Sequence, residues 1–153
     1  MYTETTRLRE LTIRYTLKRD VDGLPIATSR IVHTPKESAA VLMALLQHEP
    51  SEVFGVLCLS TRHHVIAYHE VGRGTIDSVG VYPREVFRAA LLTNAAALIL
   101  AHVHPSGDPS PSPDDLALTT RLVDAGRLLG IAILDHIVIG DGRYVSFKEI
   151  GRL

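Results

Sequence analysis

Apolar and polar residues follow two different periods along this chain, and the period distinguishes strands from helices. Residues 95–101 are apolar at every position, which is typical of a strand buried on both faces. Elsewhere, apolar residues three and four positions apart indicate helices with one buried face. The same patterns predict further strands at 52–59, 65–71, 75–81, 131–139 and 143–147, and helices at 34–48, 83–94 and 113–129.

Each predicted helix has a proline at or next to its first position, where a missing backbone N–H is tolerated. Thr34 stands where an N-cap belongs, with Glu37 three positions later. Ser112 and Asp115 repeat this spacing before the third helix, and Gly130 suits the left-handed residue that ends it. We expect the inner faces to contain Ala40, Val41, Ala44 and Leu45 in the first helix, and Val86, Phe87, Ala90 and Leu91 in the second.

The N-terminal part has a different pattern from the rest of the chain. Apolar and polar residues alternate over 11–17, which predicts a strand with one solvated face. A turn at 22–25 and a partner strand over 26–32 would complete a β-hairpin. We therefore divide the chain into a hairpin extension at 1–32 and a main domain at 33–153. The 11–17 strand is also a candidate edge for pairing with a second copy of the chain, so a homo-oligomer is a possible partner state.

Composition narrows the class of protein. The chain has 153 residues, of which 46% are hydrophobic and 22% charged, as expected of a soluble globular domain. No segment is long enough to cross a membrane, and the first residues lack the apolar core of a signal peptide, so we expect a cytoplasmic location. The net charge of −1 gives no support to non-specific nucleic-acid binding. Cys58 is the only cysteine, which excludes an internal disulfide and a thiolate metal cluster.

The most distinctive chemistry lies at the end of the 95–101 strand. His102 and His104 follow it, and side chains two positions apart on a strand share a face, so their imidazoles can meet at one point. A loop with several prolines then leads to Asp115 at the start of the next helix, and such a loop has few conformations to lose on folding. Asp115 supplies a third, anionic ligand. Two histidines and one carboxylate, with a fourth position for water, are typical of a catalytic zinc site.

Each half of this pattern also has a simpler interpretation. Ser-x-x-Asp before a helix is by itself more often a helix cap than a site of chemistry. Two histidines at this spacing are a weak signal when they stand alone. Their combination across a proline-rich loop, at the carboxyl end of a hydrophobic strand, favours a metal site.

The residues around this loop resemble a known family. His-x-His-Pro, then six residues, then Ser-x-x-Asp, with a glutamate upstream, looks like the JAMM motif of JAB/MPN metalloproteases. The string from His104 to Ser112, with Tyr-Pro-Arg-Glu-Val-Phe at 82–87 and Leu-Asp-His at 134–136, is similar to the RadC-like branch. The resemblance covers about residues 31–150. It implies an α/β (α+β) fold with an MPN/JAB-like, cytidine-deaminase-like mixed β-sheet flanked by helices, in a single domain.

The resemblance also implies a zinc-dependent hydrolase, a metallopeptidase or isopeptidase with one Zn²⁺ per chain and a peptide or isopeptide substrate. His102, His104 and Asp115 would be its metal ligands. Zinc would lower the pKa of a bound water, and the resulting hydroxide would attack an amide carbonyl. The sequence predicts no other cofactor.

A general base and an oxyanion donor complete the expected mechanism. The motif requires only that the base precede the histidines in the chain, so Glu49, Glu52 and Glu70 are all candidates for the general base. The family places this residue in a Glu-x-Phe strand start, which selects Glu52. Ser112 would stabilise the oxyanion as well as cap the helix, because a hydroxyl can donate one hydrogen bond and accept others.

Two other functions come from different classes. The RadC name suggests a role in DNA repair or DNA processing, but full-length members carry a helix-hairpin-helix region before this domain, and this chain resembles a short form without it. The alternative is a non-catalytic MPN scaffold. Asp135 and His136 lie in an apolar strand, where we expect a hydrogen-bonded structural pair more than a direct metal ligand.

Overall fold

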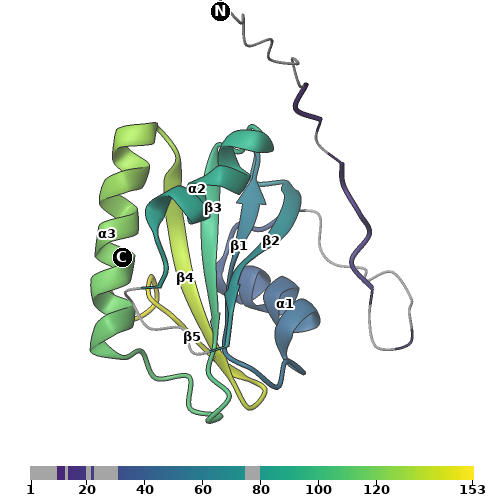
Figure 1. Cartoon of the computed structure of the whole chain (residues 1–153). Helices are drawn as coiled ribbons and strands as arrows, with labels where there is room; N and C mark the ends of the chain where they lie inside the picture. Colours follow the sequence, from purple (N-terminus) through teal and green to yellow (C-terminus); the bar gives the residue numbers. More distant parts are fainter. Residues whose placement is uncertain (1–9, 13, 20–21, 23–30, 75–79) are drawn as a thin grey trace, which may run out of the picture.

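The computed structural model describes residues 10–12, 14–19, 22, 31–74 and 80–153, in which five strands form one mixed sheet in the order β2-β1-β3-β4-β5 (Figure 1). The strands are β1 (Val53–Leu59), β2 (Val65–Arg73), β3 (Ala97–Val103), β4 (Ala132–Gly140) and β5 (Arg143–Ser146). The helices are α1 (Pro35–Leu46), α2 (Pro83–Leu92) and α3 (Pro113–Leu129). This single α+β domain confirms the predicted fold class. No described helix is both long and apolar enough to span a membrane.

The sheet separates two hydrophobic cores. On one face, α1 contributes Leu42 and Leu46 to a core that includes Leu57 and Ile99 of the central strands. On the other face, α2 and α3 pack against the alternate residues of the same strands (Figure 1). Every residue of β1 and β3 is buried, as expected of strands covered on both sides. Cys58 lies in the second core as a free, buried thiol.

The predicted helix boundaries are close to those observed, because local signals determine them. Both predicted capping boxes are present: Thr34 accepts from the backbone N–H of Glu37, and Ser112 accepts from that of Asp115. Gly130 ends α3 with a φ of 70°. α3 has the predicted range, while α1 and α2 each end two residues early.

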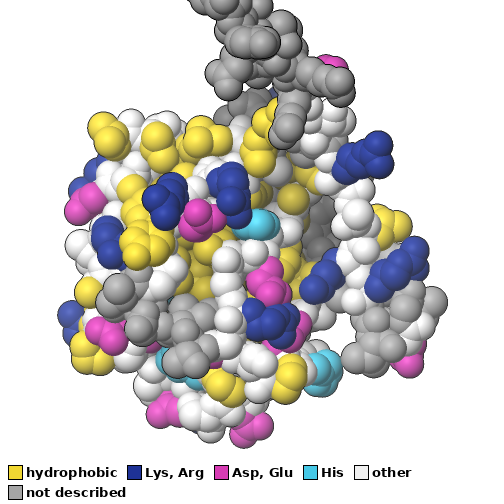
Figure 2. Space-filling view, in the orientation of Figure 1, with side chains coloured by type: hydrophobic (Ala, Val, Ile, Leu, Met, Phe, Trp, Pro, Cys, Tyr) yellow, Lys and Arg dark blue, Asp and Glu magenta, His cyan; other side chains and the backbone are white. Residues whose placement is uncertain are grey.

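The predicted inner faces of α1 and α2 were partly wrong. Ala40 and Ala44 are exposed, whereas Leu42 and Leu46 are buried. This rotation places Leu42 and Leu46 in the core instead of Ala40 and Ala44, which removes more apolar surface from water. In α2, Leu91 is 61% exposed. Figure 2 shows hydrophobic side chains among charged ones on the face of the molecule that α2 covers.

The predicted strand at 11–17 was wrong where the structure describes it, whereas its partner strand and the strand at 75–81 stay predictions. Residues 10–12 and 14–18 have no strand assignment, and most of the proposed partner at 26–32 lies outside the described residues. The expected strand at 75–81 also falls largely outside them. Ile31 forms one antiparallel bridge with His64, which joins the residues just before the main domain to the residue that precedes β2.

The register of the sheet determines which residues meet at its edge. β1 is antiparallel to β3, and Phe54 pairs with His102. The start of β1, preceded by Glu52, therefore lies beside the end of β3. β4 is parallel to β3, and the backbone N–H of His104 donates to the carbonyl of Ile139 at 2.8 Å. Three chain segments thus meet where the two histidines emerge.

Candidate metal centre

The two histidines lie together, as the sequence predicts. β3 extends to Val103, two residues further than expected, so His102 is part of the strand and His104 begins the following loop. Their ring centroids are 4.6 Å apart with an interplanar angle of 81°. His102 is 4% exposed, while His104 is only partly buried and has access to solvent. The end of β3 and the first residue of the loop therefore provide one buried and one accessible imidazole.

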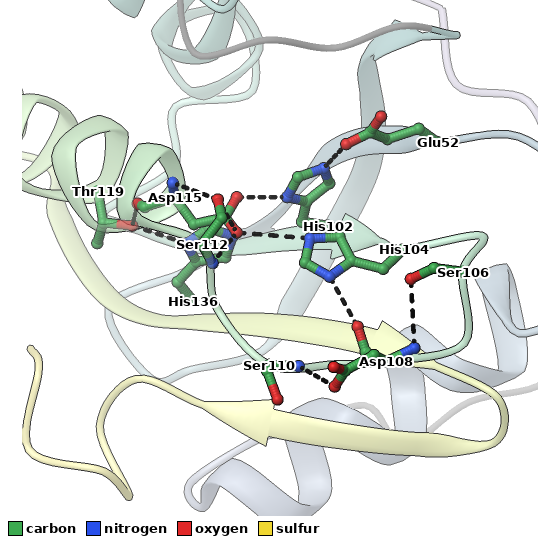
Figure 3. Close-up of polar contacts among 10 residues, drawn as sticks. All are labelled: Glu52, His102, His104, Ser106, Asp108, Ser110, Ser112, Asp115, Thr119 and His136. Carbon is green, nitrogen blue, oxygen red and sulfur yellow. Dashed lines mark hydrogen bonds and ion pairs between the residues drawn. The ribbon is translucent and has the colours of Figure 1, made fainter.

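Asp115 lies against both imidazoles (Figure 3). Its Oδ1 is 2.7 Å from Nδ1 of His102, and its Oδ2 is 3.4 Å from Nε2 of His104. The start of α3 determines this position, since Oδ2 also accepts from the backbone N–H of Ser112 at 2.7 Å and from its hydroxyl at 2.8 Å. The Asp115 carboxylate thus completes the capping box with Ser112 and contacts the histidines at the same time. The two interpretations of Ser-x-x-Asp are compatible here.

Glu52 completes the group from the other side. Its Oε1 is 2.8 Å from Nε2 of His102, and its side chain is 27% exposed. The other two glutamates that sequence order left open bind elsewhere: Glu49 and Glu70 both contact the guanidinium of Arg73. Of the three candidates, the structure therefore brings only Glu52 to His102.

The electrostatics of the site favour positive charge between the carboxylates. Burial by itself would raise the pKa of Asp115, but hydrogen bonds from His102, His104 and Ser112 outweigh it and hold the pKa well below its usual range. The hydrogen bond with Asp115 in turn raises the pKa of His104, although burial opposes this. An ionised, buried carboxylate next to imidazole nitrogens can attract protons or a metal ion.

Glu52, His102 and His104 could hold a metal ion, because each offers one ligand atom and these atoms all lie within 4.8 Å of one another. The donor set of imidazole nitrogens and carboxylate oxygens suits zinc and other first-row divalent metals. Asp115, a predicted ligand, contacts both histidines but is outside this group of three. Neighbouring donors on a tetrahedral zinc are about 3.3 Å apart, close to the 3.4 Å between Asp115 and His104.

The loop after β3 orients the ring of His104. Nδ1 of His104 lies 2.9 Å from the carbonyl oxygen of Asp108, and a carbonyl can only accept. His104 therefore carries a proton on Nδ1, so a metal would take the place of the Nε2 proton that faces Asp115. The turn between β4 and β5 packs against this loop, and Arg143 donates to the carbonyl of Gly107 at 3.1 Å.

Behind the site lies a second layer of buried polar groups that sequence reasoning found only in part. Asp135 accepts from the hydroxyl of Ser146 and from the backbone N–H groups of His136 and Lys148, which makes it a structural residue, as expected. His136 is fully buried, and burial, reinforced by the nearby His102, lowers its pKa to about 3. Thr119, which contacts His136, was not among the predicted site residues. Its position four residues after Asp115 was the only available signal.

Comparison with known proteins agrees with this geometry. Residues 32–152 match the RadC-like JAB domain family. A UPF0758 protein of Desulforudis audaxviator is 49% identical over 120 residues, covering 78% of this chain and 52% of the relative. UPF0758 proteins of Desulfitobacterium hafniense and Methanosarcina acetivorans are each 42% identical, covering 89% and 90% of this chain and 60% of each relative. The chain thus spans between about half and three-fifths of the length of these relatives, and it belongs to the RadC-like JAB domain family.

Proposed function

We propose that this domain is a zinc-dependent hydrolase of the JAMM type that cleaves amide bonds in a peptide or isopeptide substrate. The observation that carries the proposal is the convergence of Glu52, His102, His104 and Asp115 at one end of the sheet. Family membership supports it, because the JAB fold is the one that the predicted motif implied.

The residues present fit a zinc site with one accessible side. His102, His104 and Asp115 would hold the ion, in keeping with two histidines and one carboxylate at catalytic zinc sites. A bound zinc would supply a water that ionises near neutral pH and a Lewis acid for a carbonyl oxygen. The greater exposure of Glu52 and His104, compared with His102 and Asp115, marks the side from which a substrate would approach.

Glu52 is the proposed general base. Its carboxylate is partly solvated and lies at hydrogen-bond distance from His102, so it can take a proton from a water at the site. The same group can then return that proton to the leaving amine. Neither Glu49 nor Glu70 suits this role, since both carboxylates are paired with the guanidinium of Arg73.

Ser112 is the proposed oxyanion donor. In the resting site its hydroxyl donates to Asp115 at 2.8 Å and accepts from the backbone N–H of that residue at 3.1 Å. Its single hydrogen must therefore turn from Asp115 to a substrate oxygen during the reaction. The acceptor hydrogen bond can persist while it does so, because the hydroxyl oxygen keeps its lone pairs.

Metal content is the first test. We would measure it by elemental mass spectrometry on protein purified without an affinity tag, together with His104→Ala and Asp115→Asn. Asp114→Asn is the matched control, because Asp114 is the exposed neighbour in the same helical turn. We expect one zinc per chain in the unaltered protein and the control, and none in the other two. A protein that takes up no metal after zinc is supplied would contradict the proposal.

Hydrolysis is the second test. The zinc-loaded protein would be incubated with unstructured peptides and with peptides joined through a lysine side chain, and new amines would be quantified. Activity that disappears with a chelator and returns with zinc supports the proposal. Bound zinc without cleavage of either bond type would instead favour a binding domain.

A further inference from the structure

The two buried side chains behind the candidate metal centre have no part in the proposed chemistry. Thr119 lies on α3, one helical turn after Asp115, and is 2% exposed. His136 lies on β4 and is 0% exposed. β4 pairs with β3, where Leu100 stands opposite His136. A contact between Thr119 and His136 therefore joins the helix that carries Asp115 to the sheet that carries His102.

Hydrogen-bond distances assign the protons of this pair. Oγ1 of Thr119 is 2.6 Å from the carbonyl oxygen of Asp115 and 2.7 Å from Nδ1 of His136. A hydroxyl has one hydrogen, and a carbonyl can only accept. If that hydrogen goes to Asp115, the hydroxyl oxygen must accept from an N–H at Nδ1 of His136.

The other ring nitrogen supports the same tautomer. Nε2 of His136 is buried and has no hydrogen-bond partner among the described residues. The alternative tautomer would leave a buried N–H without an acceptor, whereas the Nδ1–H form leaves only an unfilled lone pair. In native structures, a buried N–H group without an acceptor is rarer than a buried acceptor without a donor. His136 is therefore neutral and protonated on Nδ1.

Packing fixes the orientation of the ring. Phe147 and Phe54 flank it at centroid distances of 4.5 Å and 5.7 Å. The ring of His102 lies nearly parallel to it, at 6.3 Å with an interplanar angle of 19°. His136 thus has one polar attachment, to Thr119, and apolar or aromatic contacts elsewhere. Because the ring is fixed by its packing on β4, its hydrogen bond with Thr119 can hold the first turns of α3 at a fixed position relative to β4.

We propose that Thr119 and His136 are positioning residues for Asp115, holding the first turns of α3 against β4 so that the Asp115 carboxylate meets His102 and His104. The effect of these two residues on metal binding rests on the proposed function. Their effect on the contact between His102 and Asp115 does not depend on it. Groups that orient metal ligands through hydrogen bonds typically change metal affinity by about 10- to 100-fold when removed.

Three variants separate positioning from simple core packing. Thr119→Val removes the hydroxyl and keeps the shape of the side chain, Thr119→Ser restores the hydroxyl, and His136→Leu removes the ring. Thr120→Val is the matched control, because Thr120 makes the same bond to the carbonyl four residues earlier, at 3.0 Å, but faces solvent. If His136→Leu fails to fold, Thr119→Val and Thr119→Ser still decide the outcome.

The first measurement is nitrogen-15 NMR of histidine side chains in metal-free protein. We expect His136 as the neutral Nδ1–H tautomer. We also expect the signal of the His102 ring nitrogen that contacts Asp115 to shift or broaden in Thr119→Val. In Thr119→Ser and Thr120→Val this signal should match that of the unaltered protein. An Nε2–H tautomer, or an unchanged resonance in Thr119→Val, would overturn the proposal.

The second measurement is zinc affinity by competition with a chromophoric chelator. We expect about 10-fold weaker binding in Thr119→Val and an affinity near that of the unaltered protein in Thr119→Ser and Thr120→Val. Equal affinity in all four proteins would overturn the link to metal binding. If the unaltered protein binds no zinc, the proposed function fails, and the NMR result alone decides whether the pair positions Asp115.

Discussion

Nε2 of His102 lies 2.8 Å from Oε1 of Glu52, although the two residues are 50 positions apart in the chain. The antiparallel register of β1 and β3 produces this contact, because Phe54 pairs with His102 and so carries the start of β1 to the end of β3. The buried histidine therefore touches Glu52 through one ring nitrogen and Asp115 through the other. This links the proposed base directly to the proposed metal ligands.

Replacing Glu52 by glutamine tests its role as the base. Glutamine keeps the size of the side chain but cannot take a proton, so we expect hydrolysis to fall by about 100- to 10,000-fold while zinc content is unchanged. Glu49→Gln is the control, since Glu49 binds Arg73. Initial rates and elemental analysis would be measured on the same samples. Loss of zinc in Glu52→Gln would show that Glu52 is a ligand instead.

Two equivalent capping boxes allow the two roles of Ser112 to be separated. Ser112→Ala and Thr34→Ala each remove a side chain that caps a helix, so we expect each to lower the free energy of unfolding by about 1 kcal/mol. Only Ser112→Ala should also lower kcat, by about 100-fold, if its hydroxyl stabilises the oxyanion. Urea unfolding and steady-state kinetics provide the measurements. Equal kcat in both variants would leave Ser112 as a cap and nothing more.

The close approach of β4 to the loop after β3 (residues 104–112) predicts a difference between two glycines. A Cβ atom at Gly140 would lie 2.7 Å from the carbonyl carbon and oxygen of Gly107, whereas one at Gly142 would meet nothing within 4 Å. Gly140→Ala must therefore displace the loop whose Asp108 carbonyl orients His104.

We expect Gly140→Ala to cost about 1–3 kcal/mol of stability and to weaken zinc binding. Gly142→Ala is also strained, because Gly142 has a φ of 67°, but it should leave zinc affinity unchanged. Chelator competition and thermal unfolding would be run on both variants. The prediction is wrong if the two variants lose zinc affinity equally.

The lowered pKa of Glu37, in the first turn of α1 and away from the candidate metal centre, predicts that the stability of the fold depends on pH. Hydrogen bonds from the backbone N–H groups of His33 and Thr34 lower the pKa of Glu37 from 4.5. A carboxyl group with a lowered pKa in the folded state contributes stability above its unfolded pKa, and this contribution is lost as the pH falls through the folded pKa. Stability from this residue is therefore present at pH 7 and declines below about pH 4.5.

We expect Glu37→Gln to reduce the urea midpoint at pH 7 and to have a smaller effect at pH 3. Glu10→Gln, at an exposed position outside the helices, is the control. Midpoints would be measured for both variants and the unaltered protein at both pH values. An equal reduction at pH 7 and pH 3 would mean that the charge of Glu37 contributes nothing to the cap.

The sequence by itself determined the features that depend on neighbours in the chain. The cap at Ser112 and the left-handed Gly130 follow from interactions within a few residues, and α3 has the predicted range. The burial of β3 on both faces followed from the unbroken apolar run at 95–101. The close approach of the His102 and His104 rings could be predicted from the two-residue period of a strand alone.

Only the tertiary structure decided which distant residues meet. The Glu-x-Phe resemblance selected Glu52 from the sequence, but strand register is the physical reason that Glu52, rather than Glu49 or Glu70, meets His102. The rotation of α1, which exposes Ala40, depended on packing against the whole face of the sheet. The contact of Thr119 with His136 likewise required α3 and β4 to be in place, because the free energy of such a contact depends on burial that neither segment has alone.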